Sequence, residues 1–154
     1  MKSPVFLDDL KGEWTGESRL WLSPGEPARL SETTAWIAPV AQGRFVMMRY
    51  TWAEERRPQD GLIVIGVRAP GAAVEAFWVD SGHMGDKFMA CRGAVGQDGV
   101  VSVQGTYAAP PGPDWGWRIV VILEAPSAFR IKMYNLSPDG EEALAVEAAY
   151  TRRS

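Results

Sequence analysis

The sequence is poor in the residues that most often mark a chemical centre. It contains one cysteine, Cys91, and one histidine, His83. A lone cysteine excludes an internal disulfide and a thiolate metal cluster. No stretch approaches the roughly 18 apolar residues of a membrane-spanning helix, and Asp8 and Asp9 fall where a signal peptide would be apolar. We therefore expect a cytoplasmic protein with no bound metal and no membrane association.

Basic charge is scarce as well. The chain has 16 Lys and Arg residues against 19 Asp and Glu residues, a net charge of -3. The two arginine pairs, at 56–57 and 152–153, are too short to predict a patch that binds phosphate backbones. A phosphate-binding glycine loop, a paired-histidine zinc motif and a Gly-x-Ser-x-Gly motif are all missing. We expect no nucleic-acid partner, and no common enzyme signature is present.

What remains is the composition of an ordinary globular domain. Of the 154 residues, 46% are hydrophobic and 23% are charged, which predicts one domain over residues 1–154 with a buried core. The first residues predict a short helix, because Ser3 can cap it, Pro4 suits its first turn, and Leu7 and Leu10 share one apolar face. Gly12 can end this helix.

Alternation of apolar and polar residues dominates the chain after Gly12 and predicts strands. Tight turn signals, such as Pro138-Asp139-Gly140 and Ala69-Pro70-Gly71, separate the segments. Consecutive hairpins can close into an up-and-down β-barrel, which leaves no exposed edge, whereas an open two-sheet sandwich is the alternative. The ten predicted strands are 14–22, 29–38, 44–53, 61–68, 74–81, 87–95, 100–107, 115–124, 129–136 and 143–152.

The densest group of polar residues lies around the end of one predicted strand, at 78–86. Alternation places Trp78 and Asp80 on one face and Ser81 on the other, and a turn carries His83. Neighbours on a strand diverge, so Asp80, Ser81 and His83 do not predict a catalytic triad. Two interpretations stay open. Asp80 either accepts backbone hydrogen bonds in the turn, or fixes a ligand with His83 acting as an acid or base.

Seven tryptophans and six methionines favour a cavity for a small, largely apolar molecule, although the same residues also build filled cores. Arg49 and Glu147 lie in apolar strands and would form a polar floor if they pointed inward. The candidate ligand-binding residues are Trp36, Arg49, Trp78, Asp80, His83, Met84, Trp117 and Glu147. Two alternatives to a binding protein remain: an enzyme that uses Asp80 and His83, and a filled-barrel interaction protein, including a homodimer, that exposes Trp21, Trp52 or Phe77.

The segment Gly12-Glu13-Trp14-Thr15-Gly16-Glu17 resembles the Gly-x-Trp signature that opens the first strand of lipocalins and other calycins. The resemblance implies a calycin barrel. In lipocalins this tryptophan packs against an arginine of the last strand, which makes Trp14 and either Arg152 or Arg153 the expected structural pair.

The chain also resembles, over most of its length, a bacterial family known as domain of unknown function 1579. The matching stretches are GEWTGESRLWL (12–22), GRFVMMRY (43–50), DGLIVIG (60–66), WVDSGHMG (78–85) and MYNLSPDGEEALAVEAAYTR (133–152). That family implies a barrel and no activity. Nitrobindin-like calycins share the Gly-x-Trp-x-Gly opening, but their haem needs a histidine near the C-terminal end of the chain. Because His83 lies at a central turn, we expect no haem and no other cofactor.

Overall fold

The structure, a computed structural model, describes residues 5–68 and 73–153. The predicted helix start at Ser3 and Pro4 and the turn at 69–71 lie outside these residues. A short helix precedes ten strands: α1 (Val5–Asp9), β1 (Gly12–Leu20), β2 (Arg29–Val40), β3 (Phe45–Glu54), β4 (Arg57–Arg68), β5 (Ala73–Asp80), β6 (Met89–Val95), β7 (Val101–Tyr107), β8 (Trp115–Ala125), β9 (Ala128–Leu136) and β10 (Glu142–Arg152).

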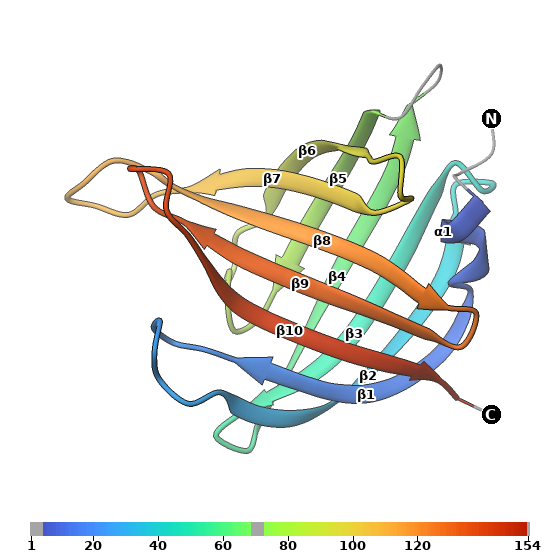
Figure 1. The fold of residues 1–154 in the computed structure, drawn as a ribbon, viewed down its shortest axis with the longest axis horizontal. Helices are drawn as coiled ribbons and strands as arrows, with labels where there is room; N and C mark the ends of the chain where they lie inside the picture. Colours follow the sequence, from blue (N-terminus) through green and yellow to red (C-terminus); the bar gives the residue numbers. More distant parts are fainter. Residues whose placement is uncertain (1–4, 69–72, 154) are drawn as a thin grey trace.

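The ten strands close into one antiparallel barrel (Figure 1). Each strand pairs with the next along the chain, and β1 closes the sheet by pairing with β10 from Trp14↔Arg152 to Leu20↔Val146. The predicted up-and-down barrel is confirmed, and the open sandwich is wrong. Closure satisfies both edges of the sheet, as expected for a meander of this length.

Strand β4 begins four residues before its predicted start, at Arg57. The pairing of β3 with β4 continues to Glu54↔Arg57. Only Glu55 and Arg56 form the turn, and both have positive φ, 49° and 68°. A two-residue turn of this kind matches the twist of the flanking strands, so the hairpin extends to its tip.

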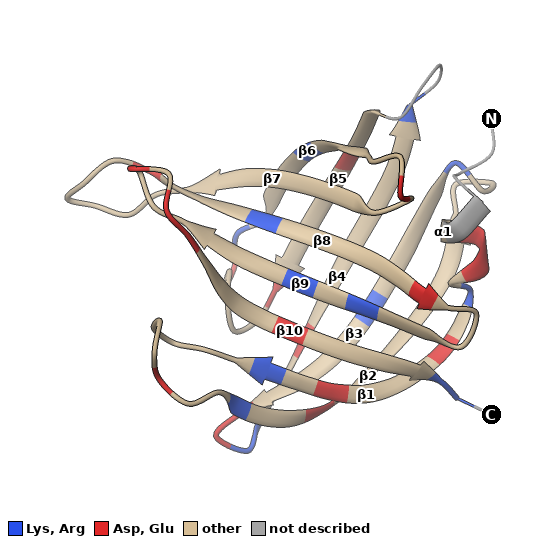
Figure 2. Ribbon diagram, in the orientation of Figure 1, with Lys and Arg blue, Asp and Glu red and all other residues tan. Residues whose placement is uncertain are grey.

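Alternate residues of each strand point into the barrel and form its core. In β3, for example, Val46, Met48, Tyr50 and Trp52 are buried, while the residues between them are exposed or half-buried. Charged positions of both signs are interspersed over the strands (Figure 2).

One end of the barrel is covered by α1 (Figure 1). Leu7 and Leu10 are each 1% exposed, and Trp14 is fully buried beneath the helix. The Trp14 indole N–H donates to the backbone carbonyl of Leu10 at 2.8 Å. This contact fixes the helix on the barrel, and we call this end the closed end.

Arg152 completes the closed end. Its guanidinium carbon lies 4.2 Å from the centre of the Trp14 ring. The same group donates to the backbone carbonyls of Lys11 at 2.5 Å and Asp9 at 2.6 Å. Of the two arginines that the sequence offered, the structure therefore places Arg152, not Arg153, against Trp14.

Candidate functional site

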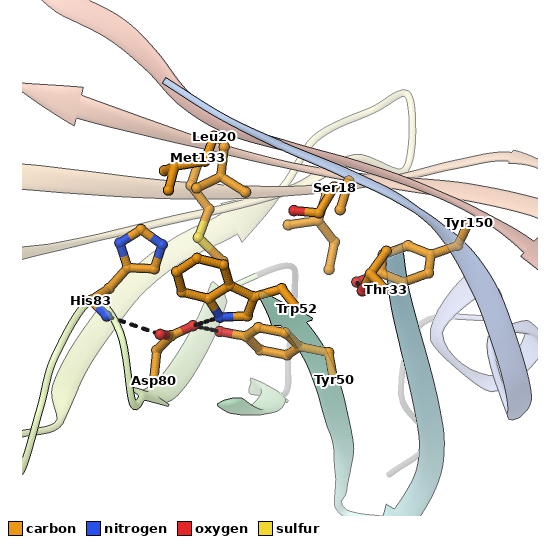
Figure 3. Close-up of a pocket in the computed structure, with 12 residues that line it drawn as sticks. Ser18, Leu20, Thr33, Tyr50, Trp52, Asp80, His83, Met133 and Tyr150 are labelled. Carbon is orange, nitrogen blue, oxygen red and sulfur yellow. Dashed lines mark hydrogen bonds between the residues drawn. The ribbon is translucent and has the colours of Figure 1, made fainter. Parts of the chain in front are cut away.

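The opposite end of the barrel, where β5 connects to β6 through residues 81–88, holds a buried carboxylate. Asp80 is 2% exposed. One carboxylate oxygen accepts from the Tyr50 hydroxyl at 2.5 Å and the Trp52 indole N–H at 3.1 Å. The other accepts from the backbone N–H of Gly82 at 2.8 Å. It also accepts from the backbone N–H of His83 at 2.9 Å (Figure 3). Asp80 therefore ties the 81–88 loop to strand β3.

Two glycines make room for the aromatic rings of this network. A Cβ on Gly61 would lie 2.3 Å from the ring of Tyr50, and a Cβ on Gly82 would lie 2.4 Å from the ring of Trp52. Any larger residue would displace these rings from Asp80. The network therefore depends on glycine at both positions.

Tyr50 links Asp80 to a second tryptophan. Its hydroxyl accepts from the Trp78 indole N–H at 2.8 Å while it donates to Asp80. Burial, followed by the charge of Asp80 and the hydrogen bond to it, raises the pKa of Tyr50 well above its ordinary value. Tyr50 therefore stays protonated and remains a donor to the carboxylate.

The two side chains of Asp80 and His83 are not arranged as an acid–base pair requires. A carboxylate offers about four acceptor sites, and four donors already occupy those of Asp80. Its bond to His83 goes to the backbone N–H, and the imidazole points away from the carboxylate (Figure 3). Ser81 lies on the outer side and donates to the Gln59 side chain at 2.6 Å. The interpretation of Asp80 as an acceptor of backbone hydrogen bonds in the turn is confirmed.

The imidazole of His83 packs among Trp52, Trp78 and Trp117, which we call the tryptophan cluster. Its centroid lies 5.0 Å from Trp52 with planes 22° apart, 5.9 Å from Trp78 and 5.6 Å from Trp117. Burial lowers the pKa of His83 below its ordinary value of 6.5, against the opposing effect of the Asp80 and Glu54 charges. The ring is therefore uncharged at neutral pH.

Two cavities meet at His83. The larger, about 540 Å³, opens at the end of the barrel and is called here the mouth pocket. The smaller, about 20 Å³, lies inside the barrel and has room for about one water molecule. The mouth pocket is lined by Trp78, His83, Met84, Lys87, Phe88, Met89, Thr106, Tyr107, Ala108 and Trp117. His83 lines both cavities.

Hydroxyl groups line the far side of the interior cavity (Figure 3). Thr33 and Tyr150 share a hydrogen bond of 2.9 Å, and Ser18 lies beside them. Burial raises the pKa of Tyr150 to about 12. These hydroxyl groups are neutral at physiological pH, so this side of the interior cavity is polar but uncharged, whereas the Asp80 carboxylate lines another part of the cavity.

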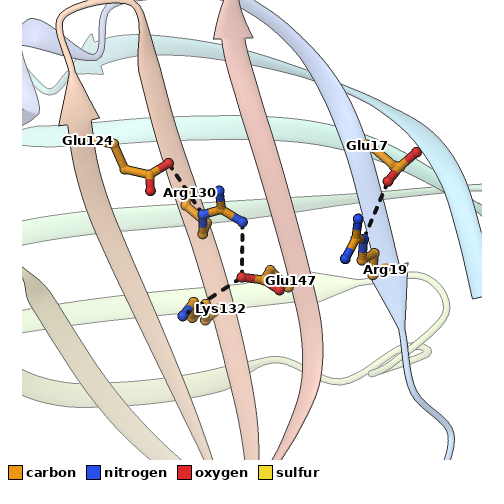
Figure 4. Close-up of polar contacts among 6 residues, drawn as sticks. All are labelled: Glu17, Arg19, Glu124, Arg130, Lys132 and Glu147. Atoms are coloured by element: carbon orange, nitrogen blue, oxygen red, sulfur yellow. Dashed lines mark hydrogen bonds and ion pairs between the residues drawn. The ribbon is translucent and has the colours of Figure 1, made fainter. Parts of the chain in front are cut away.

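Three predicted ligand-binding residues do not line the interior. Trp36 is 44% exposed on the outer face of β2 and pairs with Arg49, which is also exposed. Glu147 points outward, where its carboxylate lies 3.0 Å from Arg130 and 3.8 Å from Lys132 (Figure 4). The prediction that Arg49 and Glu147 form a polar floor inside the barrel is wrong, because each charge meets water or an opposite charge outside the barrel.

The structure brings together the other five predicted residues, Trp78, Asp80, His83, Met84 and Trp117, at the open end. Tyr50, their partner in the structure, was not among the predicted site residues. Trp52 was predicted as a possible surface residue, whereas it is 8% exposed and faces inward. The apolar alternation of β3 was the signal that could have placed both residues inside.

Two features are absent from residues 5–68 and 73–153. Within these ranges, no three His, Cys, Asp or Glu side chains are grouped so that they could hold a metal ion. None of the described helices has the length and apolar character needed to cross a bilayer.

Comparison with known proteins supports the fold and gives little on activity. The family described as "Protein of unknown function (DUF1579)" matches residues 3–152. Rv2717c from M. tuberculosis superposes with a TM-score of 0.67 and 14% identity over 100% of both chains. The S-type phycobiliprotein lyase CPES from Guillardia theta superposes with a TM-score of 0.63 and 12% identity over 100% of this chain and 94% of its own. No curated protein matches the chain in sequence.

Proposed function

Because the chain belongs to the DUF1579 family, whose description assigns no activity, we propose from the geometry of its open end that it binds a small, largely apolar molecule. The observation that carries the proposal is the mouth pocket of about 540 Å³. Pockets of roughly 300–1,000 Å³ lined by aromatic and apolar side chains are typical of small-molecule sites. The ligand body belongs in this pocket, since the interior cavity has room for about one water molecule.

The lining of the mouth pocket supports an apolar ligand. Two tryptophans, Trp78 and Trp117, stack with centroids 5.4 Å apart and planes 6° apart and form one wall. Met84 and Met89 add flexible thioether surface, which adapts to ligands of different shape. Lys87 supplies a positive charge among the lining residues. A molecule with an apolar body and a polar or anionic end fits this distribution.

The probe 1-anilinonaphthalene-8-sulfonate tests the proposal, because it has an apolar body and one negative charge. We expect saturable binding with one probe per chain, followed by probe fluorescence and by native mass spectrometry of the complex. Ala108 lines the pocket, so Ala108→Trp should fill it and weaken probe binding at least about tenfold.

The matched control is Ala94→Trp, because Ala94 is exposed on β6 and is absent from the pocket lining. This variant should bind the probe like the wild type. Absence of saturable binding, or equal weakening in the two variants, would count against a ligand site at the mouth.

A further inference from the structure

The imidazole of His83 occupies a place that suits a ligand ring. Its centroid distances of 5.0–5.9 Å to Trp52, Trp78 and Trp117 fall in the range of aromatic pairs. The same side chain lines both the mouth pocket and the interior cavity. A ring that displaced it would therefore gain the three aromatic contacts at a position that borders both cavities.

One indole of the tryptophan cluster has an unused donor. Trp52 donates to Asp80 and Trp78 donates to Tyr50. Trp117 is 7% exposed, and its indole N–H has no acceptor among residues 5–68 and 73–153. A buried donor without an acceptor is costly, so a ligand that brings an acceptor to this position gains a contact that the protein cannot supply by itself.

Building on the proposed function, we propose that the tryptophan cluster takes a planar aromatic ring bearing a hydrogen-bond acceptor, which replaces the imidazole of His83 and accepts from the Trp117 indole N–H. The backbone N–H of His83 stays bonded to Asp80. The imidazole therefore leaves by rotation of its own side chain, and the loop keeps its place.

The charge of the site restricts the acceptor further. Asp80 is a buried carboxylate at the base of the cluster, and its four hydrogen bonds leave no donor free to neutralise a second anion there. A carboxylate placed beside it would be repelled. The acceptor is therefore neutral, such as a ketone or amide carbonyl, whereas any negative group of the ligand points toward Lys87 in the mouth pocket.

Acetophenone and cumene are matched probes for this ligand class, because they have nearly the same shape and only acetophenone carries a carbonyl. Titration of ¹⁵N-labelled protein, followed through the indole N–H resonances, gives both dissociation constants. We expect acetophenone to move the Trp117 resonance downfield and cumene to leave it without that shift. Trp117→Phe should reduce the preference for acetophenone over cumene about 3- to 10-fold, whereas Trp36→Phe on the outer face should not change it.

Removal of the imidazole tests the replacement step. His83→Ala should bind acetophenone about 2- to 10-fold more tightly than the wild type, because no aromatic stacking has to be broken first. Asp86→Ala, an exposed change in the same loop, should leave the affinity unchanged. Circular dichroism and the dispersion of the indole resonances verify that each variant is folded.

The outcomes separate this inference from the proposed function. Saturable binding of 1-anilinonaphthalene-8-sulfonate without binding of either aromatic probe would overturn the ligand class and leave the mouth site standing. The same conclusion holds if His83→Ala does not tighten binding, or if Trp117→Phe keeps the full preference for the ketone. If none of the three probes binds, the proposed function itself is refuted.

Discussion

Tyr50→Phe removes one hydroxyl and leaves the ring in place, so it tests the Asp80 network without creating a large cavity. The hydroxyl takes part in two hydrogen bonds, one donated to the Asp80 carboxylate and one accepted from Trp78. All three residues are at most 8% exposed. The three residues are shielded from bulk solvent, so most of the cost should appear in the free energy of unfolding.

The magnitude follows from these two bonds. A hydrogen bond to a charged group contributes about 1.5–3 kcal/mol, and a buried N–H that loses its acceptor costs about 1–3 kcal/mol. We expect Tyr50→Phe to lower the free energy of unfolding by about 3–5 kcal/mol. Tyr150→Phe is the matched control, because Tyr150 is also buried in the barrel but its hydroxyl, among the residues that the structure describes, pairs only with neutral Thr33. That change should cost about 1 kcal/mol.

Urea denaturation followed by tryptophan fluorescence and circular dichroism measures both losses, provided that the m-value is unchanged between variants. The two tyrosine variants differ from the wild type by the same single atom, so differences in packing largely cancel. Equal losses of unfolding free energy in the two variants would refute the conclusion that the hydrogen bonds to Asp80 hold the site together.

Three further predictions concern other parts of the barrel. Arg152→Ala should cost about 2–3 kcal/mol in urea denaturation through the lost Trp14 stacking and carbonyl bonds, whereas Arg153→Ala should cost almost nothing. Lowering the pH from 7 to 5 should destabilise the wild type more than His83→Phe. Burial lowers the folded-state pKa of His83 below 6.5, so the unfolded chain takes up the proton first and stability is lost as pH falls through that range. Cys91 is 1% exposed with a pKa raised to about 11, so a disulfide reagent should label it far more slowly in the folded protein than in the urea-unfolded chain.

The barrel itself was predictable because alternation and short turns act locally. Each hairpin determines the position of the next strand, and a chain of such hairpins closes when its two end strands can pair. The Gly-x-Trp opening also located Trp14 correctly at the closed end. Strand ends were less predictable, as β4 shows, because the two-residue turn at Glu55 and Arg56 carries no glycine, asparagine or aspartate.

The face of individual strand residues was harder to predict. In β2 the inward residues include Thr33 and Ala35, which are small. From the sequence alone, the larger Trp36 beside them would be taken for the core residue, although it faces outward. The large rings of Tyr50 and Tyr150 enter the same interior. Small residues on one strand are balanced by large residues on its neighbours, and a single strand does not reveal this balance.

The face on which a charged residue of an apolar strand lies was equally hard to predict. Glu147 faces outward because Lys132 lies directly across from it on β9 and Arg130 reaches it diagonally (Figure 4). The sequence contains all three residues, but their pairing depends on the register between β9 and β10. That register includes a shift between Leu144 and Val146, which local patterns do not indicate.

Asp80 determines what can move at the open end. Its bonds to the N–H groups of Gly82 and His83 hold the start of the 81–88 loop, and its bonds to Tyr50 and Trp52 hold it against β3. Movement of the whole loop would break charge-assisted hydrogen bonds in a buried site, whereas rotation of the imidazole breaks only aromatic contacts. Side-chain rotation is therefore the less costly movement at the open end. By the same reasoning, Tyr50→Phe should loosen the loop as well as lower stability, so amide hydrogen exchange at Gly82 and His83 should accelerate more than in Tyr150→Phe.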